Sequence, residues 1–231
     1  MLIKYSGKNK FIFVANTKCA STSIVHSKIA ELSDINSTYA RPRIGRHMSL
    51  DDIYENFNFL FEEFKFNEFF KFGIIRDPLD WVVSWFNFRS RPEISDPKHK
   101  KHQDYTGDLT FTEFWHLYKN MDFLKIPQKT IFFSMKSESI RVDYLARYEK
   151  LSENLSLIQG ILGLDSLNIP KMNESSVRRI NPNDVEDSLK EEIREKYKSD
   201  YDLIEHLESF NSRGLEFFKN RIVTSNNETM A

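Results

Sequence analysis

The sequence predicts an α/β fold, a single domain over residues 1–231 in which helices flank a central, mainly parallel sheet. Three observations carry this prediction. Residues 11–15 form a continuous apolar run of β-favouring residues, as in a strand buried on both faces. Segments with apolar residues spaced by threes and fours alternate with such runs. The chain has only 7 Gly and 7 Pro and no internal repeat or low-complexity linker, which favours one compact unit.

Composition narrows the classes of protein to which this chain can belong. Hydrophobic residues make up 40% of the chain and charged residues 29%, with 20 Phe, so global disorder is excluded. Lys plus Arg number 33 and Asp plus Glu 34, which gives a net charge of -1. This balance excludes a bulk electrostatic attraction to nucleic acid or to an anionic membrane. A site for an anionic ligand must therefore be formed by a local group of residues rather than by the net charge of the chain.

Cysteine usage and hydropathy bear on the compartment. The single Cys19 cannot form an intrachain disulfide, and the apolar run near the N-terminus is too short for a secretory signal. No stretch approaches the roughly eighteen apolar residues of a membrane span. We therefore expect a soluble protein without a membrane span, in a reducing, cytoplasmic setting.

The first half of the chain predicts two junctions between a strand and a helix. The first strand is expected at 11–15, followed by a polar loop over 16–23 and a helix with Val25, Ile29 and Leu32 on its apolar face. Ser49 and Asp52 form a capping signal for the next helix. Its apolar stripe is Leu50, Ile53, Phe57, Leu60 and Phe64. A second strand at 72–75 ends at Arg76, after which Asp77 suits an N-cap and Pro78 a first helical turn. The apolar face of that helix is Trp81, Trp85 and Phe88.

The second half continues the alternation. Residues 91–108 are polar, with two prolines and a basic run at 98–102, and are predicted to form a mobile acceptor loop. Thr110 and Glu113 cap a short helix. Further elements are strands at 130–133 and 142–147, a helix at 152–162 ending near Gly163, and surface helices that carry Val185, Leu189, Ile193, Tyr197, Tyr201, Ile204 and Leu207. The folded core is expected over about 11–201, with a flexible tail at 222–231.

The loop after the first strand has the chemistry of an anion site. Lys18 precedes a run of small and hydroxyl-bearing residues at a predicted helix N-terminus, so backbone N–H groups, hydroxyls and one ammonium converge. Phosphate is the natural ligand of such a loop. The alternative is a turn followed by an ordinary Ser/Thr N-cap. The loop is not a Walker A sequence, because it has no glycine and its lysine comes early.

The second junction adds another anion site. Arg76 ends a strand and Ser84 lies about two turns into the following helix, so a guanidinium and a hydroxyl can share one further phosphate. Two anion sites at two junctions of one sheet indicate a bisphosphate nucleotide. The sequence thus predicts a P-loop-like nucleotide-binding core.

Four segments together resemble one family, the sulfotransferases that use 3′-phosphoadenosine 5′-phosphosulfate (PAPS). They read NTKCASTSI, IIRDPLDWVVSWF, RYEKLSENL and NIPKMNESS, and they resemble the carbohydrate-type and bacterial branches from residue 11 to about residue 201. The resemblance implies that the 5′-phosphosulfate is bound by Lys18, Cys19, Ala20, Ser21, Thr22 and Ser23. It implies that Arg76 and Ser84 bind the 3′-phosphate, and that 3′,5′-ADP is the product. Thr17 stands where the family usually has proline.

Arg178 and Arg179 follow the last of these segments. Either can reach the 3′-phosphate from the C-terminal side, and Arg178 is included among the predicted ligands. A solvated basic pair is the alternative.

The resembled chemistry needs charge stabilisation and a base. A lysine aimed at the bridging oxygen of the 5′-phosphosulfate stabilises the charge that gathers there, and this role falls to Lys18. A sulfuryl group carries less charge than a phosphoryl group, so no metal is predicted. The resemblance makes His47 the candidate base for an acceptor hydroxyl. The alternatives are a loop histidine without a role, or a base among Glu113, Glu149, His99 and His102.

The sequence leaves alternatives open for the acceptor site and for the reaction. The predicted acceptor is a hydroxyl on a carbohydrate or another small metabolite. Arg41, Arg43, Arg46 and the 98–101 run either line a cleft for it or form a solvated surface. Rival functions are a P-loop-like kinase using ATP and a nucleotide-binding protein without catalysis. The missing Walker glycines and the pair of Arg76 and Ser84 disfavour the kinase.

Overall fold

The computed structural model describes residues 1–37, 45–134, 138–167, 169–170 and 178–228. The chain forms two compact units. The sheet unit holds residues 1–75, 128–172 and 203–231, and the helical unit holds residues 76–127 and 173–202. Since the chain passes four times from one unit to the other, no single cut separates them, and one domain over residues 1–231 stays a prediction.

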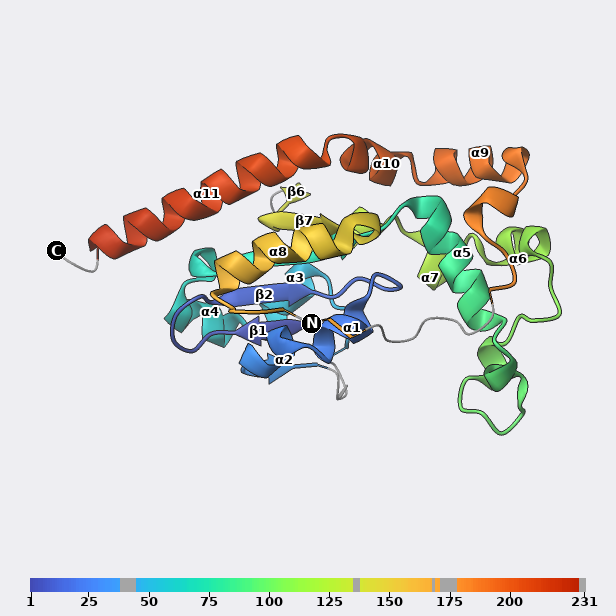
Figure 1. Cartoon of the computed structure of the whole chain (residues 1–231), viewed down its shortest axis with the longest axis horizontal. Helices are drawn as coiled ribbons and strands as arrows, with labels where there is room; N and C mark the ends of the chain where they lie inside the picture. The colour runs from blue at the N-terminus through green and yellow to red at the C-terminus, as the bar shows by residue number, and fades with distance from the viewer. Residues whose placement is uncertain (38–44, 135–137, 168, 171–177, 229–231) are drawn as a thin grey trace. The chain divides into compact units, whose positions relative to one another are not determined.

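A sheet with a parallel core forms the centre of the sheet unit (Figure 1). Within the described residues its strands are β1 (Leu2–Lys4), β2 (Phe11–Val14), β3 (Ile35–Asn36), β4 (Phe70–Ile75) and β7 (Tyr144–Arg147). They lie in the order β3-β1-β2-β4-β7. The strands β2, β4 and β7 are parallel, whereas β1 is antiparallel to β2 and β3. The predicted α/β class with a central, mainly parallel sheet is confirmed.

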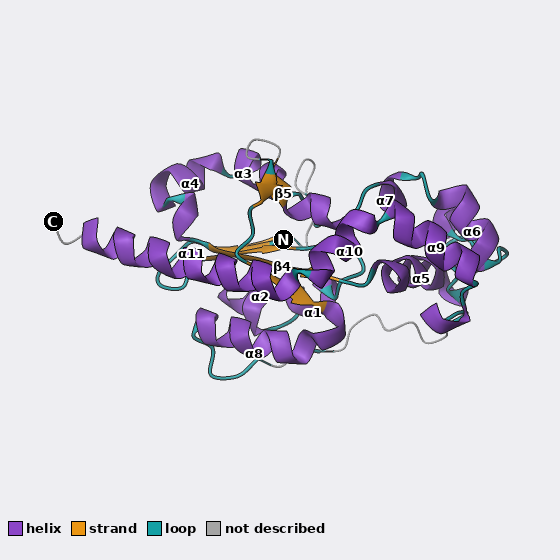
Figure 2. Ribbon diagram, turned by 90° about the horizontal axis from the view of Figure 1, so that it is seen from above, coloured by secondary structure: helices purple, strands orange, loops and turns teal. Residues whose placement is uncertain are grey.

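Helices cover both faces of this sheet (Figure 2). On one side lie α1 (Ser21–Val25), α2 (Lys28–Leu32) and α8 (Leu151–Leu162), and on the other lie α3 (Leu50–Asn56) and α4 (Asn58–Phe64). The long helix α11 (Leu207–Glu228) runs along β7. No described helix combines the length and apolar character that crossing a membrane requires.

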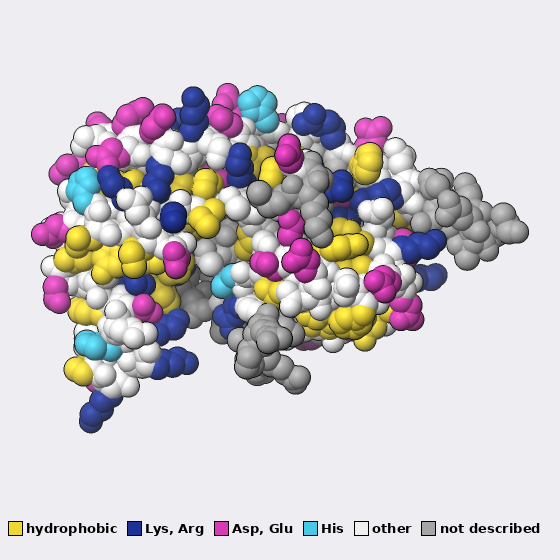
Figure 3. Space-filling view, turned by 180° about the vertical axis from the view of Figure 1, so that it is seen from behind, with side chains coloured by type: hydrophobic (Ala, Val, Ile, Leu, Met, Phe, Trp, Pro, Cys, Tyr) yellow, Lys and Arg dark blue, Asp and Glu magenta, His cyan; other side chains and the backbone are white. Residues whose placement is uncertain are grey.

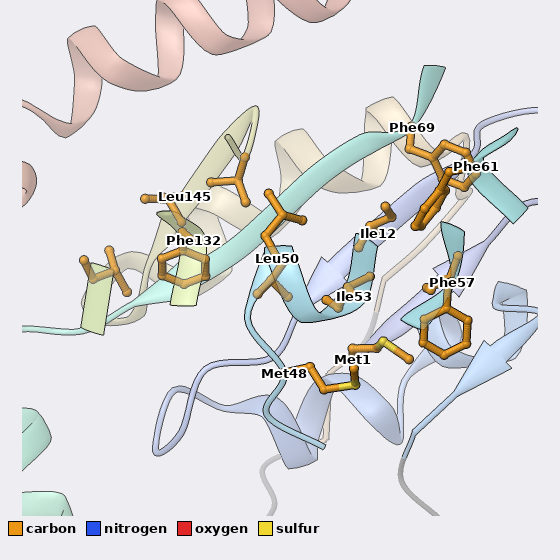
Figure 4. Packing of buried hydrophobic residues seen from close by; sticks show 14 of the residues in the cluster. Met1, Ile12, Met48, Leu50, Ile53, Phe57, Phe61, Phe69, Phe132 and Leu145 are labelled. Carbon is orange, nitrogen blue, oxygen red and sulfur yellow. The ribbon is translucent and has the colours of Figure 1, made fainter. Parts of the chain in front are cut away.

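Alternation along β2 divides the core between the two faces. Ile12 and Val14 point into a cluster with residues of α3 and α4, and Figure 4 shows Leu50 and Ile53 of α3 turned toward Ile12. Phe13 points to the other face, where its ring lies 5.2 Å from that of Phe72 in β4. Both faces of the sheet are therefore buried at β2, which explains why the sequence of this strand is a continuous apolar run.

The first expected strand is in fact the second. The strand β1 precedes it and pairs antiparallel with it, with Ile3 opposite Ile12. The strand β1 is only three residues long and is followed by a polar segment, so its apolar pattern is too short to predict a strand.

Two predicted helices are each broken in the middle. The helix expected around Val25 to Leu32 is split into α1 and α2, because the Ser27 hydroxyl accepts a hydrogen bond from the Ile29 N–H and starts a new helix. The helix expected from Ser49 breaks at Phe57 into α3 and α4. Its predicted start is confirmed, since Ser49 and Asp52 form a capping box.

The strand predicted at 130–133 is wrong for most of its length. A 3₁₀ helix, Gln128–Phe132, occupies this stretch, and only the short β5 (Phe133–Ser134) follows and pairs with β6 (Ser139–Ile140). A short apolar run does not distinguish a strand from a buried helical turn. The strand predicted at 142–147 is found as β7, and the helix expected at 152–162 is found as α8, which ends at Gly163 with a positive φ.

The helical unit is built around α5 (Pro78–Arg89). Its other helices are α6 (Phe111–Tyr118), α7 (Asp122–Lys125), α9 (Asp187–Lys196) and α10 (Lys198–Glu205), within which the chain returns to the sheet unit. Asp77 caps α5 and Pro78 begins it, as predicted, and Thr110 with Glu113 forms the predicted capping box of α6. Tyr197, fully buried, packs its ring 5.6 Å from that of Trp81 on α5.

The polar connection at 91–108 is folded onto the helical unit. It contains two 3₁₀ helices, Pro92–Ser95 and His102–Asp104. Arg89 pairs with Asp104 at 3.3 Å, and the Thr106 N–H donates to the Arg89 carbonyl oxygen. Its role toward an acceptor stays a prediction. At the other end of the chain, α11 extends to Glu228, so residues 222–228 of the predicted tail are helical.

Further 3₁₀ helices lie at Phe66–Glu68, Tyr148–Lys150 and Pro182–Asp184.

The described surface mixes both signs of charge, as Figure 3 shows for one face. This agrees with the net charge of -1 and with the absence of a bulk field.

A buried ionic cluster fastens α11 to the sheet. Lys71 of β4 is almost fully buried, and its Nζ lies 3.5 Å from Asp143 Oδ2, while Arg221 of α11 binds the other oxygen of Asp143. Burial lowers the pKa of Lys71 to about 8 even though Asp143 opposes the shift. The side chain of Asn211 also binds the backbone of Leu145 in β7, accepting from its N–H at 2.8 Å and donating to its oxygen at 3.0 Å.

Replacing Asp143 by asparagine should lower the free energy of unfolding by about 3 to 5 kcal/mol, because it leaves the Lys71 charge buried without a counter-charge. Urea unfolding followed by circular dichroism measures this. Asp187→Asn is the matched control, because Asp187 pairs with Lys190 at a fully exposed position. Equal losses in the two variants would show that the cluster does not stabilise the fold. In the wild type the unfolded state binds more protons than the folded state between pH 8 and 10.5, so the contribution of Lys71 to stability rises with pH there.

Candidate functional site

The loop that follows β2 has an unusual backbone. Lys18 and Ala20 have positive φ values of 56° and 53°, whereas Cys19 between them does not. Such alternation turns successive N–H groups toward one side and forms a concave anion-binding backbone. Because α1 after the loop has only five residues, its dipole adds little, so the backbone and Lys18 are the groups of this loop that are suited to an anion.

Buried amide side chains hold this loop from behind. The Asn16 side chain donates to Gln128 Oε1 at 3.2 Å and to the carbonyl oxygen of Ile74 at 3.4 Å, and it accepts from the N–H of Thr17 at 2.8 Å. The Cys19 thiol lies 3.4 Å from Gln128 Oε1. These contacts maintain positive φ values that non-glycine residues adopt only at a cost. The sequence gives no local signal for Gln128, which is 109 residues from Cys19.

The predicted ligands in this loop differ in what they offer. Cys19 is fully buried, so its thiol is not accessible to a ligand. The Ser21 and Ser23 side chains are buried at the start of α1, whereas Ala20 and Thr22 are half-buried. Lys18 is half-buried as well, so its ammonium is within reach of solvent.

His47 lies against the end of β2. Its Nδ1 is 2.8 Å from the carbonyl oxygen of Ala15, three residues before Lys18. A carbonyl oxygen only accepts, so Nδ1 carries the proton, and in the neutral ring Nε2 carries the lone pair. His47 as a whole residue is exposed to solvent. The structure thus places His47 in the tautomer that a general base needs.

The two predicted catalytic residues share an electrostatic environment. The pKa of His47 lies below its usual value, chiefly because surrounding protein desolvates the ring. The hydrogen bond to Ala15 opposes this shift, and the charges of the N-terminus, Arg46 and Lys18 lower the pKa further. The ring is therefore neutral at pH 7 and ready to accept a proton. The structure brings Lys18 and His47 together at the same end of β2.

The second predicted site lies at the start of α5. Arg76 directly follows the last residue of β4, and its side chain is only 9% exposed. Its Nε donates to Asp80 Oδ2 at 2.7 Å, a contact that the sequence analysis did not anticipate. Ser84 is half-buried one turn beyond Asp80 on the same helix. Arg76 therefore lies just before α5 and Ser84 within it, with Asp80 between them.

The segment that carries Arg178 is fastened to α5. The buried side chain of Asn87 accepts hydrogen bonds from the N–H groups of Arg179 and Ile180 at 2.8 and 3.3 Å, and it donates to the Ile180 oxygen at 2.9 Å. Asn87 is three residues after Ser84, on the same side of the helix. Arg178 is exposed, while Arg179 donates to the carbonyl oxygen of Gly107 at 2.6 Å.

Most rivals of His47 have other contacts. Glu113 is held by Thr110 in the capping box, and these hydrogen bonds lower its pKa, which weakens it as a base. Glu149 pairs with Arg147 at 2.9 Å. His99 Nδ1 accepts from the Lys101 N–H, and His102 Nδ1 lies 3.2 Å from the Ile94 oxygen.

Some predicted features lie outside the described residues. They are Arg41, Arg43 and most of the segment NIPKMNESS. In the part of the chain that the structure describes, no three His, Cys, Asp or Glu side chains are grouped as a metal site would require.

Comparison with known proteins gives one match. The family model described as "Sulfotransferase family" matches residues 2–219, which is nearly the whole chain. No curated protein and no solved structure matches.

Proposed function

This chain belongs to the sulfotransferase family, and we propose that it is an enzyme that transfers a sulfuryl group from PAPS to a hydroxyl, on a carbohydrate or another small metabolite. The observation that carries the proposal is the meeting of Lys18 and His47 at the end of β2, beside a backbone shaped for an anion. An anion loop alone would suit any nucleotide-binding protein. A neutral histidine beside it, with Nε2 as its basic atom, supports catalysis.

The residues of the loop fit the donor. PAPS, when bound, supplies an activated sulfuryl group and leaves as 3′,5′-ADP. The N–H groups around Cys19 and the Ser and Thr hydroxyls after it can bind the 5′-phosphosulfate, since an anion attracts several donors at once. Lys18 lowers the cost of the charge that develops on the bridging oxygen. His47 Nε2 accepts the proton of the attacking hydroxyl while Ala15 keeps the ring oriented.

The 3′-phosphate is assigned to the start of α5. Arg76 supplies a guanidinium that forms paired hydrogen bonds with phosphate, Ser84 supplies a hydroxyl, and Arg178 adds charge from the neighbouring segment. No metal is part of the proposed mechanism. We also propose that the protein works in a reducing, cytoplasmic setting, because Cys19 is fully buried and the sequence has no second cysteine.

The donor class is tested by binding. We expect the wild-type protein to prefer 3′,5′-ADP over 5′-AMP and over ATP in isothermal titration. Arg76→Ala should remove about 1.5 to 3 kcal/mol of the binding free energy of 3′,5′-ADP and little of that of 5′-AMP, because only the former has a 3′-phosphate.

Arg213→Ala is the matched control, because Arg213 is exposed on α11 and bonds only the carbonyl oxygen of its own helix among the contacts described. If Arg76→Ala kept the wild-type preference between the two nucleotides, the 3′-phosphate assignment would be wrong. Release of 3′,5′-ADP from PAPS in the presence of a panel of sugars then tests the transfer itself.

A further inference from the structure

Arg76 is nearly buried and pairs with the carboxylate of Asp80. Its side chain is 9% exposed, and its Nε donates to Asp80 Oδ2 at 2.7 Å. Asp80 is itself fixed, because its N–H donates to the Asp77 cap at 3.1 Å in the first turn of α5. The guanidinium therefore has a counter-charge whose own backbone is anchored.

The position of Asp80 is unexpected for an anion site. Asp80 lies four residues before Ser84 on the same face of α5, and Arg76, just before the helix, contacts Asp80 directly. A carboxylate between two proposed phosphate ligands repels a phosphate. Asp80 therefore either opposes binding of the 3′-phosphate or contributes something that outweighs the repulsion.

Two properties of arginine favour the second alternative. A guanidinium that is almost fully buried is costly without a counter-charge, and Asp80 supplies one. Arginine also has many rotamers, and binding phosphate through a planar fork requires one of them. A hydrogen bond to Nε fixes the plane of the guanidinium before the ligand arrives.

We propose that Asp80 is a positioning residue for 3′-phosphate recognition, which orients Arg76 by accepting a hydrogen bond from its Nε. The inference rests on the proposed function, because it takes Arg76 as a ligand of the 3′-phosphate. It assigns to Asp80 no contact with the nucleotide. Its effect is specific, since orientation of Arg76 matters for 3′,5′-ADP and not for 5′-AMP.

The test compares dissociation constants of 3′,5′-ADP and 5′-AMP in Asp80→Asn, Asp80→Glu and the wild type by isothermal titration. Asp80→Asn keeps the size of the side chain and weakens its bond to Arg76, so the preference for 3′,5′-ADP should fall about tenfold. Asp80→Glu retains a carboxylate and should keep more of the preference than Asp80→Asn. Asp187→Asn, at an exposed position at the start of α9, is the matched control and should leave the preference unchanged.

Each other outcome overturns the proposal in a distinct way. Tighter binding of 3′,5′-ADP by Asp80→Asn would mean that Asp80 only competes with the phosphate. A lower Tm with an unchanged ratio of dissociation constants would mean that it only stabilises α5. A wild type without any preference would remove the 3′-phosphate site, and with it the role of Asp80, whereas a preference that survives in Asp80→Asn would overturn the role of Asp80 alone.

Discussion

Lys18→Ala should lower kcat/KM for sulfuryl transfer by about 10² to 10³ while changing the affinity for 3′,5′-ADP far less. The reason is that the lysine charge matters most when the bridging oxygen becomes negative, and the product has no such developing charge. Steady-state kinetics with PAPS and a titration with 3′,5′-ADP measure the two effects separately.

Lys28→Ala provides the control, because Lys28 is an exposed lysine of α2 that binds Ser166. Its kinetics should match those of the wild type. An equal loss of product affinity and of kcat/KM in Lys18→Ala would make Lys18 a binding residue only.

His47→Ala should lower kcat by about 10² to 10⁴, the range for loss of a general base, and should leave nucleotide affinity nearly intact. The pH profile adds a second readout. A base works in its deprotonated form, so the wild-type rate should rise with pH through the pKa of His47. Because desolvation, and to a smaller extent nearby positive charges including Lys18, lower that pKa, the midpoint of the acidic limb should lie below the usual pKa of histidine, and the limb should vanish in the variant.

His26→Ala is the matched control, since His26 is exposed at the end of α1. Near-normal turnover in His47→Ala would move the role of base to Glu113, or to His99 or His102 in the polar connection at 91–108. An unchanged thermal shift with 3′,5′-ADP in the same sample shows that the fold is intact, so the result then reports on chemistry.

Local chemistry made part of the fold predictable. The capping boxes at Ser49 and Thr110 and the Asp77 cap depend on residues within one turn, and all three are found. The strand β1 and the 3₁₀ helix Gln128–Phe132 were missed because their state is set by what they pack against. The break at Ser27 was missed because the apolar spacing continues across it.

The candidate site was likewise predictable from the sequence only in part. Lys18 and Arg76 could be chosen from residue type and from their positions after predicted strands, whereas His47 was chosen from the resemblance to the sulfotransferase family and its position before a predicted helix. The contacts that orient them come from residues that local patterns do not mark, such as Gln128 behind the loop and Asp80 beside Arg76. The positive φ of Lys18 and Ala20 was equally hidden, since neither is a residue that favours the left-handed region.

The Asn211 side chain completes the hydrogen bonding of β7 at Leu145 as a neighbouring strand would. In the described sheet β7 is the last strand on its side, and such a border normally offers unpaired groups to any extended peptide. Here the carboxamide of Asn211 occupies the template at Leu145, and the carboxamide of Asn154 in α8 accepts from the Arg147 N–H at 3.2 Å. Addition of a foreign strand at Leu145 is therefore opposed by a helix that docks through Gly214, where any larger residue would collide with the Asp143 backbone. Protection of this border thus depends on the docking of α11 and α8 rather than on the sheet itself.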